Sequence, residues 1–264
     1  HALLPRLLAL AIPVLAGLAF MTAFGAPPAY LVGNAGALAI ALLWLAVGRL
    51  PVDRLGRRLL ASALLAILAL PLLMGPEING VARWVPVGPV VLHSDMLALP
   101  AFAVLVAQER EDGALLLLCA LFLTLLQPDA ASAFALTFAA VGLHHVTRDW
   151  RMGVVAIAGF VAGIVAALRG ELPAQPFVER VVVEALDRSG LAALGLFGAL
   201  VASYLLILFR GRPTAAERFA LAGTLFGFGV MALMSNYPSP LIGYGAAPIL
   251  GYGVALGFRQ ELSS

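Results

Sequence analysis

The stretch 76–95 holds the side chains best suited to chemistry in an otherwise apolar sequence. Asn79, the Arg83–Trp84 pair and Asp95 lie within it, and apolar segments flank it on both sides. Arginine carries a permanent positive charge on a planar group that binds phosphate or pyrophosphate through paired hydrogen bonds. Because polar groups at membrane depth are costly, we predict that this stretch forms part of a functional face.

The same residues also suit structural roles. An interfacial loop can use Trp84 as an anchor at the headgroup level and Arg83 as a contact to a lipid phosphate. Ser94 or Asp95 can cap the apolar segment that follows, since an acid there complements the helix dipole. The functional hypothesis is that Asp95 points into a groove and pairs with an arginine such as Arg83.

Further acids follow at Asp129 and in the segment 176–188. Asp129 comes after Pro128, which can end one helix while the acid caps the next. The segment 176–188 has the spacing of a short amphipathic helix that lies along a membrane surface rather than crossing it. One of its acids, Glu179 or Glu184, could act as a general base, and the spacing does not choose between them. The structural alternative is an interfacial helix whose acids meet water.

The segment 237–248 combines three prolines with Gly243 and Gly245. The prolines predict a broken helix start, which membranes tolerate where it lines a cavity. The two glycines permit either close helix packing or an approach of the backbone to a ligand.

The composition places these segments in a membrane protein. Of the 264 residues, 62% are hydrophobic and 11% charged, against about 45–50% and about 25% in soluble domains. A span needs roughly 20 apolar residues. We predict ten spans, at 3–23, 29–48, 58–75, 95–108, 113–127, 129–146, 152–168, 189–209, 217–234 and 240–258. The predicted fold is an all-α polytopic membrane protein, one integral membrane domain over 1–264. It has outer loops at 76–94 and 169–188, the second carrying an interfacial helix after the seventh span.

Arginine supplies all sixteen basic residues and sets the predicted orientation. Twelve arginines fall on one side when the loops are sorted alternately, and the positive-inside rule places that side, with both termini, in the cytoplasm. These are Arg6, Arg49, Arg54, Arg57, Arg58, Arg110, Arg148, Arg151, Arg210, Arg212, Arg218 and Arg259. The outer face carries the other four arginines and seven acids: Arg83, Arg169, Arg180, Arg188, Glu77, Asp95, Asp129, Glu171, Glu179, Glu184 and Asp187.

Other features disfavour several classes of protein. Cys119 is the only cysteine, which excludes a disulfide framework and a cysteine metal motif. The segment 2–23 is long enough to span and is followed by more spans, so no cleaved signal peptide is expected. No nucleic-acid partner is expected either. Because no acid lies deep within a span, a proton-coupled transporter is disfavoured.

Three of these segments together resemble the SEDS family, the FtsW, RodA and SpoVE type of bacterial cell-wall polymerase. Residues 79–85, Asn-Gly-Val-Ala-Arg-Trp-Val, are similar to the family's Asn-Gly-Ala-x-Arg-Trp-Ile. Residues 128–132, Pro-Asp-Ala-Ala-Ser, are similar to Pro-Asp-Leu-Gly-Thr. Residues 239–247, Ser-Pro-Leu-Ile-Gly-Tyr-Gly-Ala-Ala, are similar to Leu-Pro-Leu-Ile-Ser-Tyr-Gly-Gly-Ser. The order of these motifs and the ten predicted spans agree with the family along essentially the whole chain.

The resemblance implies a peptidoglycan glycosyltransferase in the bacterial cytoplasmic membrane. Members of the family join lipid II units at the outer face, release undecaprenyl pyrophosphate and usually work with a class B penicillin-binding protein. Alignment without gaps on Gly190 puts the family's catalytic Asp on Glu179, which implies Glu179 as the general base. Mg²⁺ or Mn²⁺ is a candidate cofactor, and no organic cofactor is expected. The expected substrate-binding residues are Arg83, Asn79, Trp84, Asp95, Asp129 and Tyr244.

The chain also departs from the family pattern. Glu179 is one methylene longer than the family's Asp. Where the family has Gln-Pro-Ser-Glu-x-x-Lys leading into a span, this chain has Leu92-His93-Ser94-Asp95, and Ala98 replaces the Lys. The family's Ser-x-Gly-Gly-Ser in the last motif has become Gly243-x-Gly245-Ala246-Ala247, without its two serines. These losses support an alternative, a catalytically inactive SEDS-fold scaffold or subunit of a membrane complex.

Overall fold

The computed structural model describes residues 3–48, 53–88, 90–109, 111–170 and 172–258. Arg49, Arg110, Glu171 and Arg259, which enter the charge analysis, lie outside the described residues. The helices are α1 (Leu3–Ala23), α2 (Pro28–Val47), α3 (Arg54–Met74), α4 (Ser94–Val106), α5 (Gly113–Leu126), α6 (Ala130–Thr147), α7 (Trp150–Ala167), α8 (Val181–Arg188), α9 (Gly190–Leu206), α10 (Ala215–Met234) and α11 (Ala246–Gly257). A π-helical turn η1 (Ile207–Gly211) extends α9, and β1 (Trp84–Val87) pairs with β2 (Val90–His93).

The helices confirm the predicted all-α membrane fold. Within the described residues, seven helices are long and apolar enough to cross a membrane: α1, α2, α3, α6, α7, α9 with η1, and α10. Three shorter apolar helices, α4, α5 and α11, bring the number to the ten predicted spans. The short helix α8 follows α7, where the amphipathic pattern predicted a helix that does not span.

Three predicted helix starts are wrong by about four residues or more. The third span was expected from residue 58, but α3 begins at Arg54. The last span was expected from residue 240, but α11 begins at Ala246, because Leu241 has a φ of 65° that no α-helix accommodates. The amphipathic helix was expected from residue 176, but α8 begins at Val181. There the chain turns through left-handed backbone at Phe177 and Arg180, with φ of 64° and 52°.

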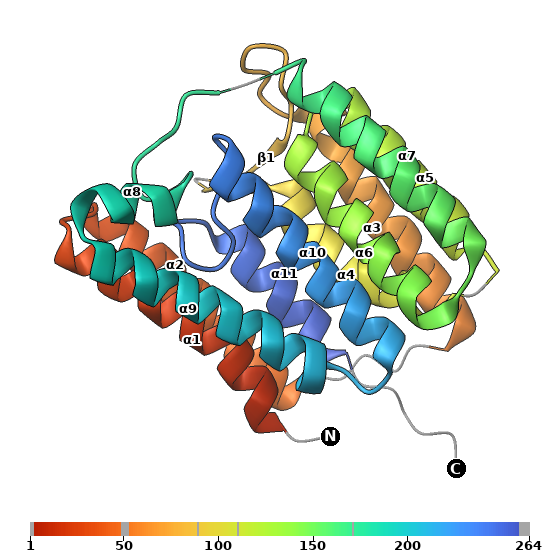
Figure 1. Ribbon diagram of the computed structural model, residues 1–264, viewed down its shortest axis with the longest axis horizontal. Coiled ribbons are helices and arrows are strands. Elements are labelled where there is room, and N and C mark those ends of the chain that lie inside the picture. Colours follow the sequence, from red (N-terminus) through yellow and green to blue (C-terminus); the bar gives the residue numbers. More distant parts are fainter. Residues whose placement is uncertain (1–2, 49–52, 89, 110, 171, 259–264) are drawn as a thin grey trace.

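Figure 1 shows α10 and α11 in the middle of the bundle, with α1, α2 and α9 on one side and α3, α5 and α7 on the other. Glycines let α10 lie directly against α6. A Cβ on Gly223 would stand 2.4 Å from the carbonyl oxygen of Phe138, and one on Gly227 would stand 2.5 Å from that of Phe134. Small residues allow such close backbone approach between membrane helices.

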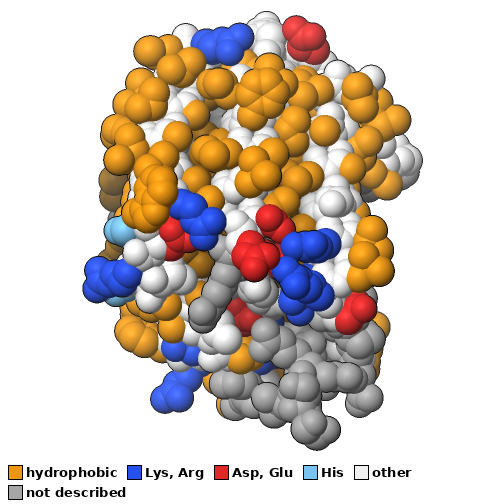
Figure 2. Space-filling view, turned by 90° about the vertical axis from the view of Figure 1, so that its right-hand side faces the viewer, with side chains coloured by type: hydrophobic (Ala, Val, Ile, Leu, Met, Phe, Trp, Pro, Cys, Tyr) orange, Lys and Arg blue, Asp and Glu red, His pale blue; other side chains and the backbone are white. Residues whose placement is uncertain are grey.

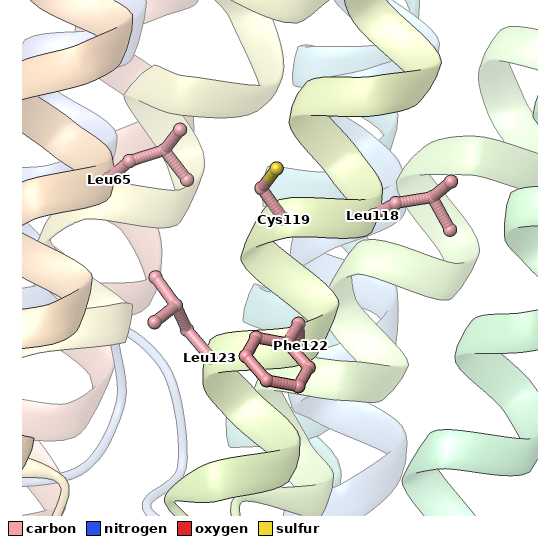
Figure 3. Close-up of a pocket in the computed structure, with 5 residues that line it drawn as sticks. All are labelled: Leu65, Leu118, Cys119, Phe122 and Leu123. Carbon is pink, nitrogen blue, oxygen red and sulfur yellow. The ribbon is translucent and has the colours of Figure 1, made fainter.

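A belt of hydrophobic side chains surrounds the bundle. Figure 2 shows it on the side where α3, α5 and α7 lie, with charged side chains gathered towards the top and in the lower part. Leu73, Phe122 and Ile157 are among the large apolar side chains exposed on these helices. A shallow pocket on the belt lies between α3 and α5, lined by Leu65, Leu118, Cys119, Phe122 and Leu123 (Figure 3). Its lining holds no acid, base or cation, so the chemistry expected from the sequence lies elsewhere.

The chain enters and leaves the bundle at the same end. Arg6 Nη1 near the start of α1 donates a hydrogen bond of 3.3 Å to the carbonyl oxygen of Leu256 near the end of α11. Because the apolar helices alternate in direction, the connections α3–α4, α5–α6, α7–α9 and α10–α11 all lie at the opposite end (Figure 1). Every residue proposed from the sequence for a site therefore falls at one end of the molecule.

Candidate functional site

The stretch 76–95 folds into a hairpin over this end of the bundle. Ile78 and Val81 exchange backbone hydrogen bonds of 3.0 Å across the pair Asn79–Gly80. Both turn residues have positive φ, 52° and 77°, as the type I′ turn favoured by Asn-Gly requires. Asn79 is exposed at the tip of this turn.

The second half of the hairpin fixes Arg83 at the start of α4. Trp84 in β1 pairs with His93 in β2. The carbonyl oxygen of Arg83 then accepts hydrogen bonds from the backbone N–H and the hydroxyl of Ser94, at 3.2 and 3.4 Å. The Arg83 side chain is thereby directed into the bundle, where only 2% of its surface is exposed.

Four charged or titratable side chains, Arg83, His93, Asp95 and Asp129, form a buried charge cluster. Their exposed fractions are 2%, 6%, 0% and 0%. Arg83 Nη1 lies 4.0 Å from Asp129 Oδ1, and His93 Nε2 lies 3.5 Å from Asp129 Oδ2. Asp129 is thus the acid at the centre of the cluster, with a cation and an imidazole on its two oxygens.

The pairing expected between Asp95 and Arg83 is wrong. Asp95 lies in the first turn of α4, where its Oδ1 accepts a hydrogen bond of 2.9 Å from the Ser94 hydroxyl. The ion pair of Arg83 is instead with Asp129, which lies between α5 and α6 at the same end of the bundle. Asp95 Oδ2 is buried and has no hydrogen-bond partner among the described residues.

Asp129 caps α6, as the sequence predicts. Its Oδ1 accepts the backbone N–H of Ser132 at 3.3 Å and its Oδ2 accepts the Ser132 hydroxyl at 2.7 Å. Burial acts to raise the pKa of Asp129, but Arg83, His93 and the hydrogen bonds from Ser132 outweigh it and hold the pKa below its usual range. The carboxyl group therefore stays ionised beside Arg83.

The cap of α4 differs from the prediction of Ser94 or Asp95. The capping side chain is His93, whose Nδ1 accepts the backbone N–H of Met96 at 3.5 Å. The hairpin places this imidazole beside the first-turn N–H groups of α4, which have no partner within the helix. Burial lowers the pKa of His93 to about 4, although Asp129 acts in the opposite direction. The imidazole is therefore neutral near pH 7, and Arg83 is the permanent cation that faces Asp129.

Glu179 lies beside this cluster in the turn before α8. It is half-buried, and its Oε2 accepts the backbone N–H of Gln175 at 2.7 Å. Burial raises the pKa of Glu179, while that hydrogen bond and the charge of Arg83 act to lower it. Left-handed backbone at Phe177 and Arg180 flanks Glu179 on both sides, and strain of this kind concentrates at functional sites.

Glu184, the other candidate base, is committed to the structure of α8. Its Oε2 accepts the backbone N–H of Phe177 at 2.7 Å, and its Oε1 accepts a hydrogen bond of 2.6 Å from Arg188. The guanidinium of Arg188 in turn lies 4.8 Å from the ring centre of Phe177. These contacts favour Glu179 as the acid available for chemistry.

The other expected substrate-binding residues lie in different surroundings. Trp84 is half-buried beside the cluster, with its ring centre 5.3 Å from the Arg83 guanidinium. Tyr244 stacks on Tyr30 of α2, with ring centres 3.8 Å apart, and donates its backbone N–H to Phe177. The structure therefore gathers Arg83, Asp95 and Asp129 into one buried cluster and places Tyr244 in a second apolar cluster with α1, α2 and α8.

Two residues of this region, Tyr237 and Asn34, were not predicted from the sequence as site residues. Tyr237 lies with its ring centre 4.8 Å from the Arg83 guanidinium, and its hydroxyl accepts the backbone N–H of Ala130 at 3.2 Å. Asn34 is fully buried in α2, with amide hydrogen bonds of 2.9 Å to the carbonyl of Gly243 and 3.0 Å from the N–H of Gly245. A polar residue inside an apolar span was the signal available for Asn34.

The cluster does not fit a resident divalent cation. Among the described residues, no group of three or more His, Cys, Asp and Glu side chains is arranged to hold a metal ion. Asp129, the central acid, already faces Arg83 and accepts two hydrogen bonds from Ser132. Mg²⁺ prefers several oxygen ligands in near-octahedral geometry, which a carboxylate engaged in this way does not supply.

The fold matches solved structures of three chains. The chain superimposes on the rod shape determining protein RodA of Thermus thermophilus with a TM-score of 0.70 and 24% identity, over 97% of this chain and 94% of RodA. An aspartate-to-alanine mutant of that RodA matches at a TM-score of 0.69 and 24% identity, over 97% and 95%. A chain from a peptidoglycan synthase complex, described as coordinating polymerization and crosslinking, matches at 0.68 and 24%, over 97% and 96%.

No protein-family model and no curated protein matches the sequence. The likeness in structure confirms the membrane fold that the SEDS resemblance implied. It extends over nearly the full length of both chains.

Proposed function

We propose that the chain is a SEDS-type glycosyltransferase of bacterial peptidoglycan synthesis. It polymerises a polyprenyl-pyrophosphate-linked sugar, lipid II, at the outer face of the cytoplasmic membrane. Two findings support this proposal: the RodA-like fold, and the gathering of the sequence motifs at one end of the bundle. Residues 1–264 form a single membrane domain in this proposal, with the loops 76–94 and 169–188 on the outer face and both termini in the cytoplasm.

The observation that carries the proposal is the link between the Glu179 turn and Arg83: the N–H of Arg180 donates to the carbonyl of Tyr237 at 3.3 Å, and the Tyr237 ring centre lies 4.8 Å from the Arg83 guanidinium. A general base works best when its pKa approaches the working pH, and burial moves the pKa of Glu179 in that direction. Glu179 takes the proton from the acceptor sugar hydroxyl as that oxygen attacks the anomeric carbon of the donor. The bond from this carbon to the pyrophosphate oxygen breaks, and the polyprenyl pyrophosphate leaves with the bonding electrons.

Arg83 is the proposed contact for the pyrophosphate. At 4.0 Å its Nη1 is beyond hydrogen-bond distance from Asp129, and its Nε has no hydrogen-bond partner among the described residues. The guanidinium therefore retains donors for an anion, which charge-assisted hydrogen bonds would hold. We place Mg²⁺ or Mn²⁺ on the pyrophosphate of the substrate rather than on the protein.

The remaining residues have supporting roles in this proposal. Asp95 and Asp129 keep the side chains of the cluster in place, and Trp84 anchors the hairpin at the membrane interface. Asn79 and Tyr244 contact parts of the substrate farther from the reacting centre. A class B penicillin-binding protein is the proposed partner, supported by the match to a chain of a peptidoglycan synthase complex.

Glu179→Gln tests the base directly. In detergent, the purified protein is incubated with lipid II, and the glycan product is measured by electrophoresis. The variant should lose about 10²–10⁴-fold in rate, the range that a general base contributes. Asp187→Asn is the matched control, because Asp187 is an exposed acid on the neighbouring helix α8 and should leave the rate near that of the wild type. Equal rates for Glu179→Gln and wild type would remove Glu179 as the base.

A second candidate function is an inactive scaffold of SEDS fold within a membrane complex. The burial of the charge cluster favours it, as does the hydrogen bond that engages Glu179 Oε2 with the N–H of Gln175. Stable co-purification with a membrane partner, without turnover of any lipid-linked sugar, would support the scaffold. Polymerisation by the chain alone would exclude it.

A further inference from the structure

The segment 237–244 runs along the turn that carries Glu179. The backbone N–H of Arg180 donates to the carbonyl of Tyr237 at 3.3 Å, and the N–H of Ser239 donates to that of Val178 at 2.9 Å. Glu179 and Pro238 form a β-bridge between these two bonds. This antiparallel pairing fixes the backbone of Glu179 to a segment almost sixty residues away in the sequence.

Ser239 and Gly243 strengthen this contact. The hydroxyl of Ser239 accepts the backbone N–H of Val181, the first residue of α8, at 2.9 Å. A Cβ on Gly243 would stand 2.8 Å from the carbonyl oxygen of Val178, so only glycine permits this approach. Left-handed backbone at Phe177 and Arg180 costs free energy that surrounding contacts must offset, and the segment 237–244 supplies those contacts.

Tyr237 joins this segment to the buried charge cluster. Its ring lies over the Arg83 guanidinium at 4.8 Å, a distance at which a cation is attracted to an aromatic face. Its hydroxyl accepts the N–H of Ala130, the residue that follows Asp129 at the start of α6. One side chain therefore touches both the cation and the helix start of the cluster, while its backbone carbonyl holds the N–H next to Glu179.

We propose that Tyr237 is a positioning residue that holds the Glu179 carboxylate at a defined distance from Arg83. This inference rests on the proposed function, because it assigns Glu179 and Arg83 to one reaction centre. Tyr237 acts through these two residues and does not touch the substrate. Its ring contacts the Arg83 guanidinium. Its backbone carbonyl binds the turn that carries Glu179, and its hydroxyl binds the start of α6.

Two substitutions separate these contacts. Tyr237→Phe keeps the ring over Arg83 and removes the acceptor for Ala130, whereas Tyr237→Ala removes both. Tyr252→Phe is the matched control, because its hydroxyl is also buried and pairs with Thr224 at 3.0 Å within the bundle. A misplacement of about 1 Å can cost roughly 10²-fold in rate.

Lipid II polymerisation is measured as kcat and KM for the four proteins. We expect kcat to fall about tenfold in Tyr237→Phe and about 10²-fold in Tyr237→Ala, with little change in KM. Tyr252→Phe should remain near the wild type in both constants. The positioning role is overturned if both Tyr237 variants match Tyr252→Phe, if the loss lies in KM, or if kcat falls only in proportion to the folded protein in each sample.

Hydrogen–deuterium exchange over 175–181 provides a readout that needs no activity. Exchange there should accelerate in the Tyr237 variants and stay unchanged in Tyr252→Phe. The segment 237–244, whose backbone pairs with this turn, loses side-chain anchors to Arg83 and Ala130, so the turn should open more often. Unchanged exchange in Tyr237→Ala overturns the inference. If the wild type shows no turnover while exchange accelerates as expected, the anchoring by Tyr237 stands and the proposed function fails. If the wild type polymerises lipid II and the Tyr237 variants match it in kcat and in exchange, the proposed function stands and the positioning role of Tyr237 fails.

Discussion

Arg83 and Asp129 face each other at 4.0 Å between the hairpin and the start of α6, both shielded almost completely from solvent. They are separated by 46 positions in the sequence and by two apolar helices, α4 and α5. Their meeting ties the connection α3–α4 to the connection α5–α6. The stability of the proposed site should therefore depend on this pair.

Asp129→Asn should destabilise the protein by about 3 kcal/mol, because it leaves the Arg83 charge buried without its counter-ion. Arg83→Met in the same background should recover part of this loss, since the unpaired charge is then gone. Thermal unfolding in detergent, followed by tryptophan fluorescence, is measured for Asp129→Asn, for Arg83→Met and for the double variant. Strictly additive losses would show that Arg83 and Asp129 do not interact.

His93 should make stability fall in mild acid. Its pKa is about 4 in the folded protein and 6.5 when unperturbed, so the unfolded state takes up the proton first as the pH falls. The stability from neutral, buried His93 is fully present above about pH 6.5 and is lost as the pH falls towards about 4, by up to about 3 kcal/mol.

His93→Asn provides the comparison for this loss. Asn can accept the N–H of Met96 through its side-chain oxygen, but it does not titrate. Denaturation midpoints at several pH values between 7 and 4 should therefore fall less steeply in His93→Asn than in the wild type. Parallel curves for the two proteins would argue against a buried neutral imidazole.

A second buried ion pair secures the other end of the bundle. Arg212 and Glu217 are both 0% exposed, with Nε and Oε2 3.1 Å apart, and Gln108 donates to the same carboxylate at 2.8 Å. Arg212 also donates to the carbonyl of Phe258, while Arg6 donates to that of Leu256. Two arginines thus satisfy carbonyl groups at the C-terminal end of α11, where cations also complement the helix dipole.

Glu217→Gln should cost about 3–5 kcal/mol, because the Arg212 charge remains buried. Glu111→Gln is the control at an exposed pair, since Arg54 and Glu111 also lie 3.1 Å apart but have exposed fractions of 63% and 78%. An exposed pair contributes at most about 1 kcal/mol. Comparable shifts of the unfolding temperature for the two variants would contradict a buried ion pair between Arg212 and Glu217.

Local features of the sequence were sufficient to predict much of the fold. Hydropathy and length give the ten apolar helices, because each helix needs its own run of apolar residues to meet hydrocarbon. The cap at Asp129 and the short helix within 176–188 follow from interactions between residues only a few positions apart. The match to RodA confirms the membrane fold that the sequence predicted.

Only the tertiary structure decides which polar groups meet. It pairs Arg83 with Asp129 rather than Asp95, makes His93 the cap of α4, and commits Glu184 to Phe177 and Arg188. These contacts depend on how helices pack, and packing distances between distant segments leave no mark on local periodicity. A charged side chain reveals in sequence only that it needs a partner, and the fold determines which partner lies within reach.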